Sequence, residues 1–172
     1  DWFKNLSHKI IEKVEYHFAK YRISDALMTI YKFIWEEFCS WFLEVVKPNQ
    51  NNLIDEKTKN EIKEIFETNL KLLSPFMPFI AEELWHLISK RETDQALINS
   101  SWPVVDSYDK KIIDDFELVK KIIVAIRNFR KEKSIGFKQK LKLKSSSKIK
   151  PKYIEIIKKM GGIESIEEYK HI

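Results

Sequence analysis

The chain has 172 residues, of which 44% are hydrophobic and 33% charged, and its formal net charge is +5. This apolar content can bury a core, whereas three glycines and five prolines are too few for the many tight turns of an all-β fold. The apolar runs fall far short of the ~20 residues that cross a bilayer, and the opening residues do not have the pattern of a signal peptide. The single cysteine excludes an internal disulfide and suits a reducing cytoplasm. We therefore expect a folded, mainly helical, cytoplasmic protein.

The positive charge is concentrated in one segment. Residues 120–152 contain thirteen Lys or Arg and one acid, whereas the rest of the chain carries eighteen bases and twenty-five acids. A basic segment on an acidic body is typical of proteins that bind a polyanion, most often a nucleic acid. A lysine-rich solvated face would leave the same pattern, so charge alone leaves both interpretations open.

Two amphipathic helices are expected first. Apolar residues at four-residue steps predict a helix over about residues 2–21. Ser24 is a suitable N-cap for a second helix, which continues to Lys47 and ends at Pro48.

The end of the second helix, WEEFCSWFLEVVKP over residues 35–48, is dense in aromatic side chains. At helical spacing most of them share one broad face, so Trp35 and Trp41 are expected to be packing residues of the core. Cys39 lies between Phe38 and Trp41 and is expected to be a buried apolar thiol.

A turn over residues 49–52 and a third helix from about Ile54 come next. That helix cannot run smoothly through Pro75. Pro78 suits the first turn of a further helix over residues 79–88, because the N–H that proline lacks would be unpaired there anyway.

A polar stretch over residues 91–100 is expected to be a surface loop, and Trp102 after it a packing anchor. A long helix then begins after Asp109. It carries four cations into its last turns, where they suit the negative end of the helix dipole. These four residues are Arg127, Arg130, Lys131 and Lys133.

Beyond Gly136 the apolar period changes from that of a helix to that of a strand. Four residues alternate with lysines and predict a half-buried strand: Phe137, Gln139, Leu141 and Leu143. A helix from Pro151 to Met160, ended by two glycines, and a returning strand over residues 163–169 are expected to follow. The sequence thus predicts an all-α antiparallel helical bundle over residues 1–135 with a small α/β extension over residues 136–172.

Residues for catalysis or metal binding are not evident. The four histidines are scattered, and none is spaced from Cys39 as a zinc ligand would be. The carboxylate pairs Glu36-Glu37 and Glu82-Glu83 occupy adjacent helical positions and should point apart. We expect no catalytic residue, metal site or cofactor in this chain.

Three segments resemble the anticodon-binding domain of valyl-tRNA synthetases. Residues 35–48 are similar to the family pattern W-x-E-F-x-x-W-[YF]-L-E-x-x-K-P, and residues 72–85, LLSPFMPFIAEELW, to L-L-x-P-x-M-P-[FY]-[IL]-x-E-E-[LI]-W. Residues 119–141 are similar to V-x-x-[IV]-x-x-[IV]-R-x-[IL]-R-x-E followed by a short loop and K-x-L.

The resemblance implies a helical domain that binds tRNA(Val) and orients it for the catalytic and editing domains of the same polypeptide. The H-I-G-H and K-M-S-K-S motifs are absent, so catalysis with ATP and Mg is expected upstream, in a valine–tRNA ligase. A family helix with the pattern N-K-[LI]-W-N-A-x-R-F precedes the region equivalent to Asp1, which implies an uncovered apolar stripe here. Two alternatives stay open: the same domain of a leucyl- or isoleucyl-tRNA synthetase, and a helical protein-interaction module with a basic surface.

Eight cations are the candidate tRNA contacts, because lysine and arginine hold RNA through its phosphates. They are Arg127, Arg130, Lys131, Lys133, Lys138 and Lys140 in the basic segment, with Lys20 and Arg22 at the first turn between helices.

Overall fold

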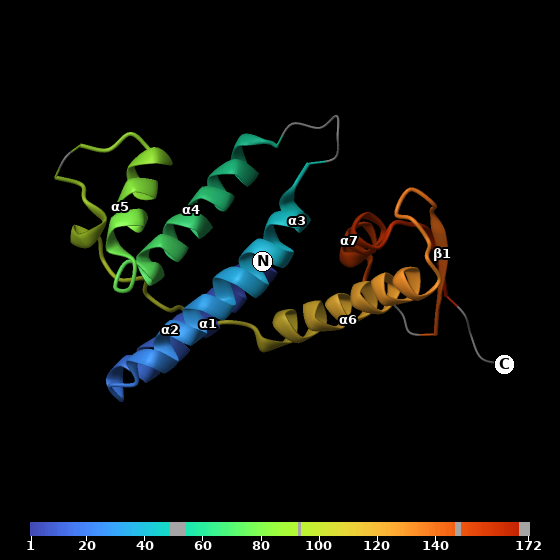
Figure 1. Cartoon of the computed structure of the whole chain (residues 1–172), viewed down its shortest axis with the longest axis horizontal. Helices are drawn as coiled ribbons and strands as arrows, with labels where there is room; N and C mark the ends of the chain where they lie inside the picture. The colour runs from blue at the N-terminus through green and yellow to red at the C-terminus, as the bar shows by residue number, and fades with distance from the viewer. Residues whose placement is uncertain (49–53, 93, 147–148, 169–172) are drawn as a thin grey trace. The chain divides into compact units, whose positions relative to one another are not determined.

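The computed structural model describes residues 1–48, 54–92, 94–146 and 149–168, and it is mainly helical with one small sheet (Figure 1). Contacts divide the chain into two compact units, Asp1–Asp109 and Lys110–Ile172. This division precedes the long helix, whereas the sequence placed a domain boundary after residue 135. The long helix belongs to the second unit because its side chains pack there. Within the described ranges, no helix has both the length and the apolar character needed to cross a membrane.

The first unit is built from helices. In chain order they are α1 (Trp2–Ala19), α2 (Ile23–Lys32), the π-helix η1 (Phe33–Phe42), α3 (Leu43–Val46), α4 (Glu56–Leu73), α5 (Pro78–Leu87) and the 3-10 turn η2 (Leu97–Asn99). The helix α1 lies beside α2 in an antiparallel pair (Figure 1). It ends two residues before the predicted limit because Tyr21 adopts a left-handed conformation, with φ 57°. The turn predicted over residues 49–52 lies outside the described residues.

An aromatic cluster forms part of the core of the first unit. The ring of Phe3 lies 5.1 Å from that of Phe33 and 4.4 Å from that of Phe42, measured between centroids. Phe38 stacks on Phe42 at 5.6 Å and on Phe66 at 5.8 Å. These contacts join α1, η1 and α4 into the predicted helical bundle.

The π-helical segment η1 changes which side chains face this core. Its i→i+5 hydrogen bonds make a wider turn than those of an α-helix, so the buried Phe33 and Phe38 are five residues apart. Trp35 and Cys39 continue the four-residue steps of Leu27 and Tyr31, whose side chains are exposed on α2. Trp35 is 62% exposed and the thiol of Cys39 is exposed, while Trp41 is half-buried. The predictions that Trp35 packs in the core and that Cys39 is buried are therefore wrong. The prediction that Ser24 is the N-cap of the second helix is also wrong, because α2 begins one residue earlier, at Ile23.

Prolines and polar caps set the ends of the next helices. Asp55 caps α4 by accepting a hydrogen bond from the Thr58 amide at 2.9 Å, and Pro78 opens α5 as predicted. The loop after α5 buries Leu97 against Trp85, so only part of this loop is surface. Trp102 packs edge-on against Phe18 at 5.9 Å, which confirms it as a packing anchor.

The second unit is a small α/β arrangement on a long helix. It consists of α6 (Lys110–Glu132), β1 (Leu141–Ser145), α7 (Pro151–Gly161) and β2 (Ile163–Glu168). The two strands pair in parallel, Leu141 opposite Ile163, and α7 connects them. Gly162 ends α7 with φ 68°, as predicted for a glycine at that point. The helix α6 packs on α7, with the ring of Phe116 5.9 Å from that of Tyr153. The predicted fold class is confirmed, although the first strand begins at Leu141 and not at Phe137.

Candidate nucleic-acid interface

The first candidate site is the turn between α1 and α2. The side chains of Lys20 and Arg22 are exposed, as the sequence predicted. Between them Tyr21 is 90% exposed and has a left-handed backbone, which is uncommon for a residue other than glycine. The amides of Tyr21 and Arg22 donate to the carbonyls of Phe18 and His17, each at 2.9 Å. The turn therefore holds an aromatic ring between two cations.

The second candidate site is the end of α6 and the loop after it. Five of the six predicted cations here are exposed: Arg127, Lys131, Lys133, Lys138 and Lys140. The ammonium of Lys133 lies 3.4 Å from the carboxylate of Glu132, but both side chains are more than half exposed, so solvent screens this pair. The ammonium of Lys140 lies 5.2 Å from the ring centroid of Phe137. The ammonium groups of the four lysines are thus accessible to phosphates.

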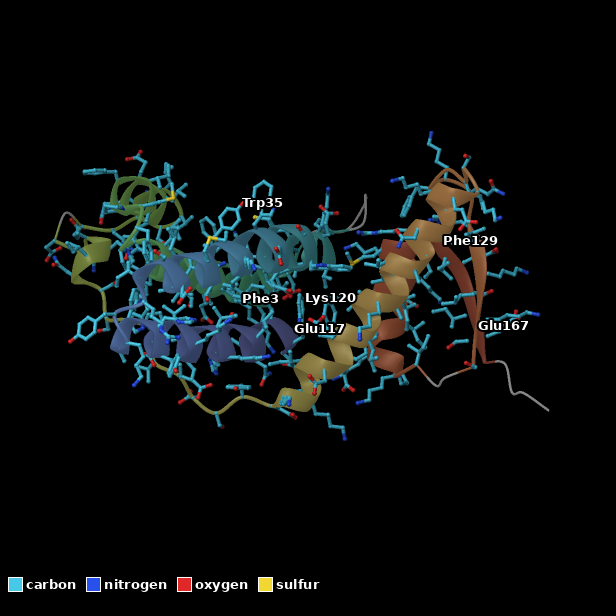
Figure 2. The ribbon with its side chains drawn as sticks, turned by 60° about the horizontal axis from the view of Figure 1, so that its bottom comes forward. Phe3, Trp35, Glu117, Lys120, Phe129 and Glu167 are labelled. Atoms are coloured by element: carbon cyan, nitrogen blue, oxygen red, sulfur yellow. The ribbon has the colours of Figure 1, made fainter. Side chains whose placement is uncertain are left out.

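Arg130 does not fit the predicted surface set. It is 6% exposed, and its guanidinium donates four hydrogen bonds to backbone carbonyls. Lys120 at the start of the basic segment is also buried, and it donates to the carboxylate of Glu117 at 2.6 Å (Figure 2). Neither cation is placed to meet RNA, and we remove Arg130 from the set of direct contacts.

Further exposed residues in the second unit extend the basic surface. Lys142 and Lys144 lie exposed on β1, and Phe129 and Phe137 are 48% and 56% exposed. Figure 2 shows Phe129 toward the end of α6. The two-residue alternation of Lys and Leu in the sequence was enough to place both lysines on one side of the strand. A groove of about 490 Å³ runs between α6 and β1, lined by Phe129 and both lysines.

The first unit also exposes an apolar stripe along α2 and η1. Ile23, Leu27, Tyr31 and Trp35 follow one another at four-residue steps and are 39% to 62% exposed. In Figure 2 the side chain of Trp35 projects away from the ribbon. Apolar side chains repeated along one exposed helix face are typical of an interaction surface.

Groups able to perform chemistry do not converge in the described residues. No cluster of three or more His, Cys, Asp or Glu there could hold a metal ion. The carboxylate of Glu82 is engaged, since it accepts the Leu97 amide at 2.9 Å and lies 2.9 Å from His86 Nε2. Glu83, its neighbour, is exposed. Glu82 therefore holds the loop at Leu97, and Glu83 is solvated.

Two physical features define the class of this protein: a bundle of α-helices, and a separate cation-rich surface of the kind that contacts RNA phosphates. Residues 1–145 match the family model described as the anticodon-binding domain of tRNA ligase. The chain belongs to this family.

Similar proteins carry more specific names. The chain is 42% identical over 169 residues to a valine–tRNA ligase of Christiangramia forsetii, which covers 97% of the chain. It is 38% identical over 167 residues to that of Parabacteroides distasonis, and 37% identical over 165 residues to that of Porphyromonas gingivalis, covering 97% and 96% of the chain. In each case it spans 19% of the length of the relative.

Proposed function

We propose that this chain is the anticodon-binding domain of a cytoplasmic valine–tRNA ligase, which binds tRNA(Val) and orients it for aminoacylation elsewhere in the polypeptide. The observation that carries the proposal is its similarity to valine–tRNA ligases along 97% of its length. The chemistry itself, with ATP and Mg²⁺, belongs to the parent enzyme, and we expect the isolated chain to be inactive.

Electrostatic attraction to the RNA backbone supplies the binding energy in this proposal. The exposed cations at the end of α6 and in the following loop contact phosphates, and Lys20 and Arg22 contact them at the other site. Tyr21 is so exposed that it can stack on an unpaired base. Phosphate contacts fix the position of the RNA, while base contacts provide the selection.

The apolar stripe on α2 and η1 has a different role in the proposal. Its residues Tyr31 and Trp35 contact another part of the parent polypeptide, which is about five times longer than this chain in the relatives. Burying them removes apolar surface from water at roughly 25 cal/mol per Å². The domain is then held in a fixed orientation to the catalytic domain.

The names of the relatives favour a valine enzyme over the leucyl and isoleucyl alternatives. Binding should therefore be measured with transcripts of tRNA(Val), tRNA(Leu) and tRNA(Ile) between 50 and 300 mM salt. We expect the tightest binding for tRNA(Val) and a steep fall of affinity with salt, with a log-log slope near 0.7 to 0.9 per phosphate contact. A flat salt response would support the protein-interaction module, and tighter binding of either other tRNA would reassign the amino acid.

A further inference from the structure

The guanidinium of Arg130 joins three segments of the second unit. Its Nε donates to the carbonyl of Gly161 at 3.0 Å, and its Nη2 to that of Gly162 at 2.9 Å, at the end of α7. Nη1 donates to the carbonyl of Gly136, and Nη2 also to that of Gln139, each at 2.9 Å. One side chain on α6 therefore ties the end of α7 to the loop over residues 133–140, which we name the basic loop.

The end of α7 and the basic loop both offer backbone carbonyls to the buried guanidinium. The last carbonyls of a helix lack partners within the helix and carry its partial negative charge, so Arg130 satisfies them at the end of α7. The amides of Lys133, Ser134 and Ile135 donate to carbonyls of α6 at 2.8 to 3.2 Å, so the helix fixes the start of the basic loop. Beyond Gly136, the amide of Gln139 donates to the Gly136 carbonyl at 3.1 Å. The position of Lys138 and Lys140, in the second half of the basic loop, thus depends on the guanidinium, whereas the backbone of Lys133 is held by α6.

We propose that Arg130 is a positioning residue for RNA binding, which acts through the basic loop and does not contact RNA itself. This inference rests on the proposed function. The planar fork of arginine makes these four bonds at once, whereas a lysine ammonium has three donors on one nitrogen and cannot reach both segments. A positive charge at position 130 is therefore not enough to hold both segments, and the planar guanidinium is required.

Arg130→Lys tests this distinction because it keeps the charge and removes the fork. We expect it to lower the affinity for tRNA(Val) about tenfold, since disordered lysines lose phosphate contacts. If Arg130 were a simple surface cation, the affinity would stay within about twofold.

A second variant disturbs the same arrangement without touching Arg130. A Cβ at Gly162 would lie 2.9 Å from Nη2 of Arg130, and the φ of 68° is strained for alanine. Gly162→Ala should therefore weaken tRNA binding by about as much as Arg130→Lys. Val124→Ala is the control in the same unit, because Val124 is 43% exposed on α6 and lies outside both the basic loop and the hydrogen bonds of Arg130. It should leave binding unchanged.

Hydrogen exchange provides a readout of loop order that does not depend on RNA. The amide of Leu141 donates to the Gly162 carbonyl at 3.3 Å, directly after the basic loop. Its exchange should accelerate in Arg130→Lys and Gly162→Ala and not in Val124→Ala. If Arg130→Lys does not fold, Gly162→Ala provides the same comparison.

A double-mutant cycle separates positioning from direct contact. We expect Arg130→Lys to change affinity by less than about twofold when Lys133, Lys138 and Lys140 have already been replaced by glutamine. An unchanged tenfold effect in that background would overturn the proposal in favour of direct contact. Faster exchange at Leu141 with unchanged affinity would also overturn it. If the variant that lacks all three lysines binds tRNA(Val) as tightly as the unaltered chain, the basic loop lies outside the interface and the inference about Arg130 fails. The proposed function would not fail with it, because that function is tested by the preference for tRNA(Val) over tRNA(Leu) and tRNA(Ile).

Discussion

The guanidinium carbon of Arg91 lies 3.7 Å from the ring centroid of Trp85, over the face of the indole. The same guanidinium donates to the carbonyl of Trp85 and to the carboxylate of Glu67 on α4. The indole N–H in turn donates to the carbonyl of Gln95 at 3.0 Å. These contacts hold the loop after α5 against the bundle.

Arg91→Lys should therefore destabilise the first unit by about 2 kcal/mol, because a lysine loses the stacking and one of the two directed hydrogen bonds while both partners remain partly buried. Urea unfolding followed by circular dichroism measures this change. Lys90→Ala, at an exposed neighbour, is the control and should shift the midpoint little. Equal midpoints for the two variants would show that this contact adds no stability.

Phe3 and Trp35 should respond to truncation in opposite ways. Phe3 is 2% exposed and touches three other phenylalanines, so Phe3→Ala should cost about 3–5 kcal/mol. Trp35 is 62% exposed, and Trp35→Ala should change stability by less than about 0.5 kcal/mol. Denaturant unfolding of both variants tests this difference in burial. A cost for Trp35→Ala close to that for Phe3→Ala would mean that the indole packs in the core.

The helices were predictable because their signals are local. Four-residue apolar steps, Pro78 and the Gly161-Gly162 pair act over one or two turns, and the structure confirms the elements that they indicate. The π-helical segment was not predictable, since its residues have the composition of an α-helix. The burial of Trp35 and Cys39 was wrongly predicted because a dense run of aromatic residues does not show which face of the helix meets the core. A pattern of 3.6 residues per turn also cannot represent the i→i+5 turns of η1.

The candidate site was predictable to a similar degree. Charge counting located the basic segment, and exposed lysines occur there as expected. Charge counting could not show that Arg130 is buried while Lys131 is exposed, because the burial of Arg130 depends on carbonyls 31 and 32 residues further along the chain. Such contacts arise from tertiary packing and leave no local signal.

Asp55 should give α4 a pH-dependent cap. Its carboxylate accepts a hydrogen bond from the Thr58 hydroxyl at 2.7 Å and another from the Thr58 amide, and these lower its pKa from the ordinary 3.8. Because the folded pKa is the lower one, the cap's contribution is present above pH 3.8 and is lost as the pH falls through the folded value. An NMR titration should show this lowered pKa, and Thr58→Val should move it back toward 3.8. No difference between the two proteins would mean that the hydroxyl does not favour the carboxylate.

Cys39 should react in the folded protein. Its side chain is exposed on η1, so a thiol reagent such as Ellman's reagent should modify it at a rate close to that in denaturant. Cys39→Ser should abolish the reaction because the sequence has no other cysteine. Protection from the reagent until the protein unfolds would instead support the buried thiol that the neighbouring Phe38 and Trp41 suggested.

Lys142 and Lys144 extend the predicted interface onto β1, and their contribution can be separated from that of nonspecific charge. Each exposed lysine that contacts a phosphate adds about 0.7 to 0.9 to the salt slope of tRNA binding, so replacing both with glutamine should lower the slope by about twice that amount. Lys57→Gln makes the same charge change on α4, in the acidic unit, and should leave the slope unaltered. An equal decrease per lysine in the control would mean that the tRNA responds only to net charge. An unchanged slope in the double variant would confine the interface to the end of α6 and the basic loop.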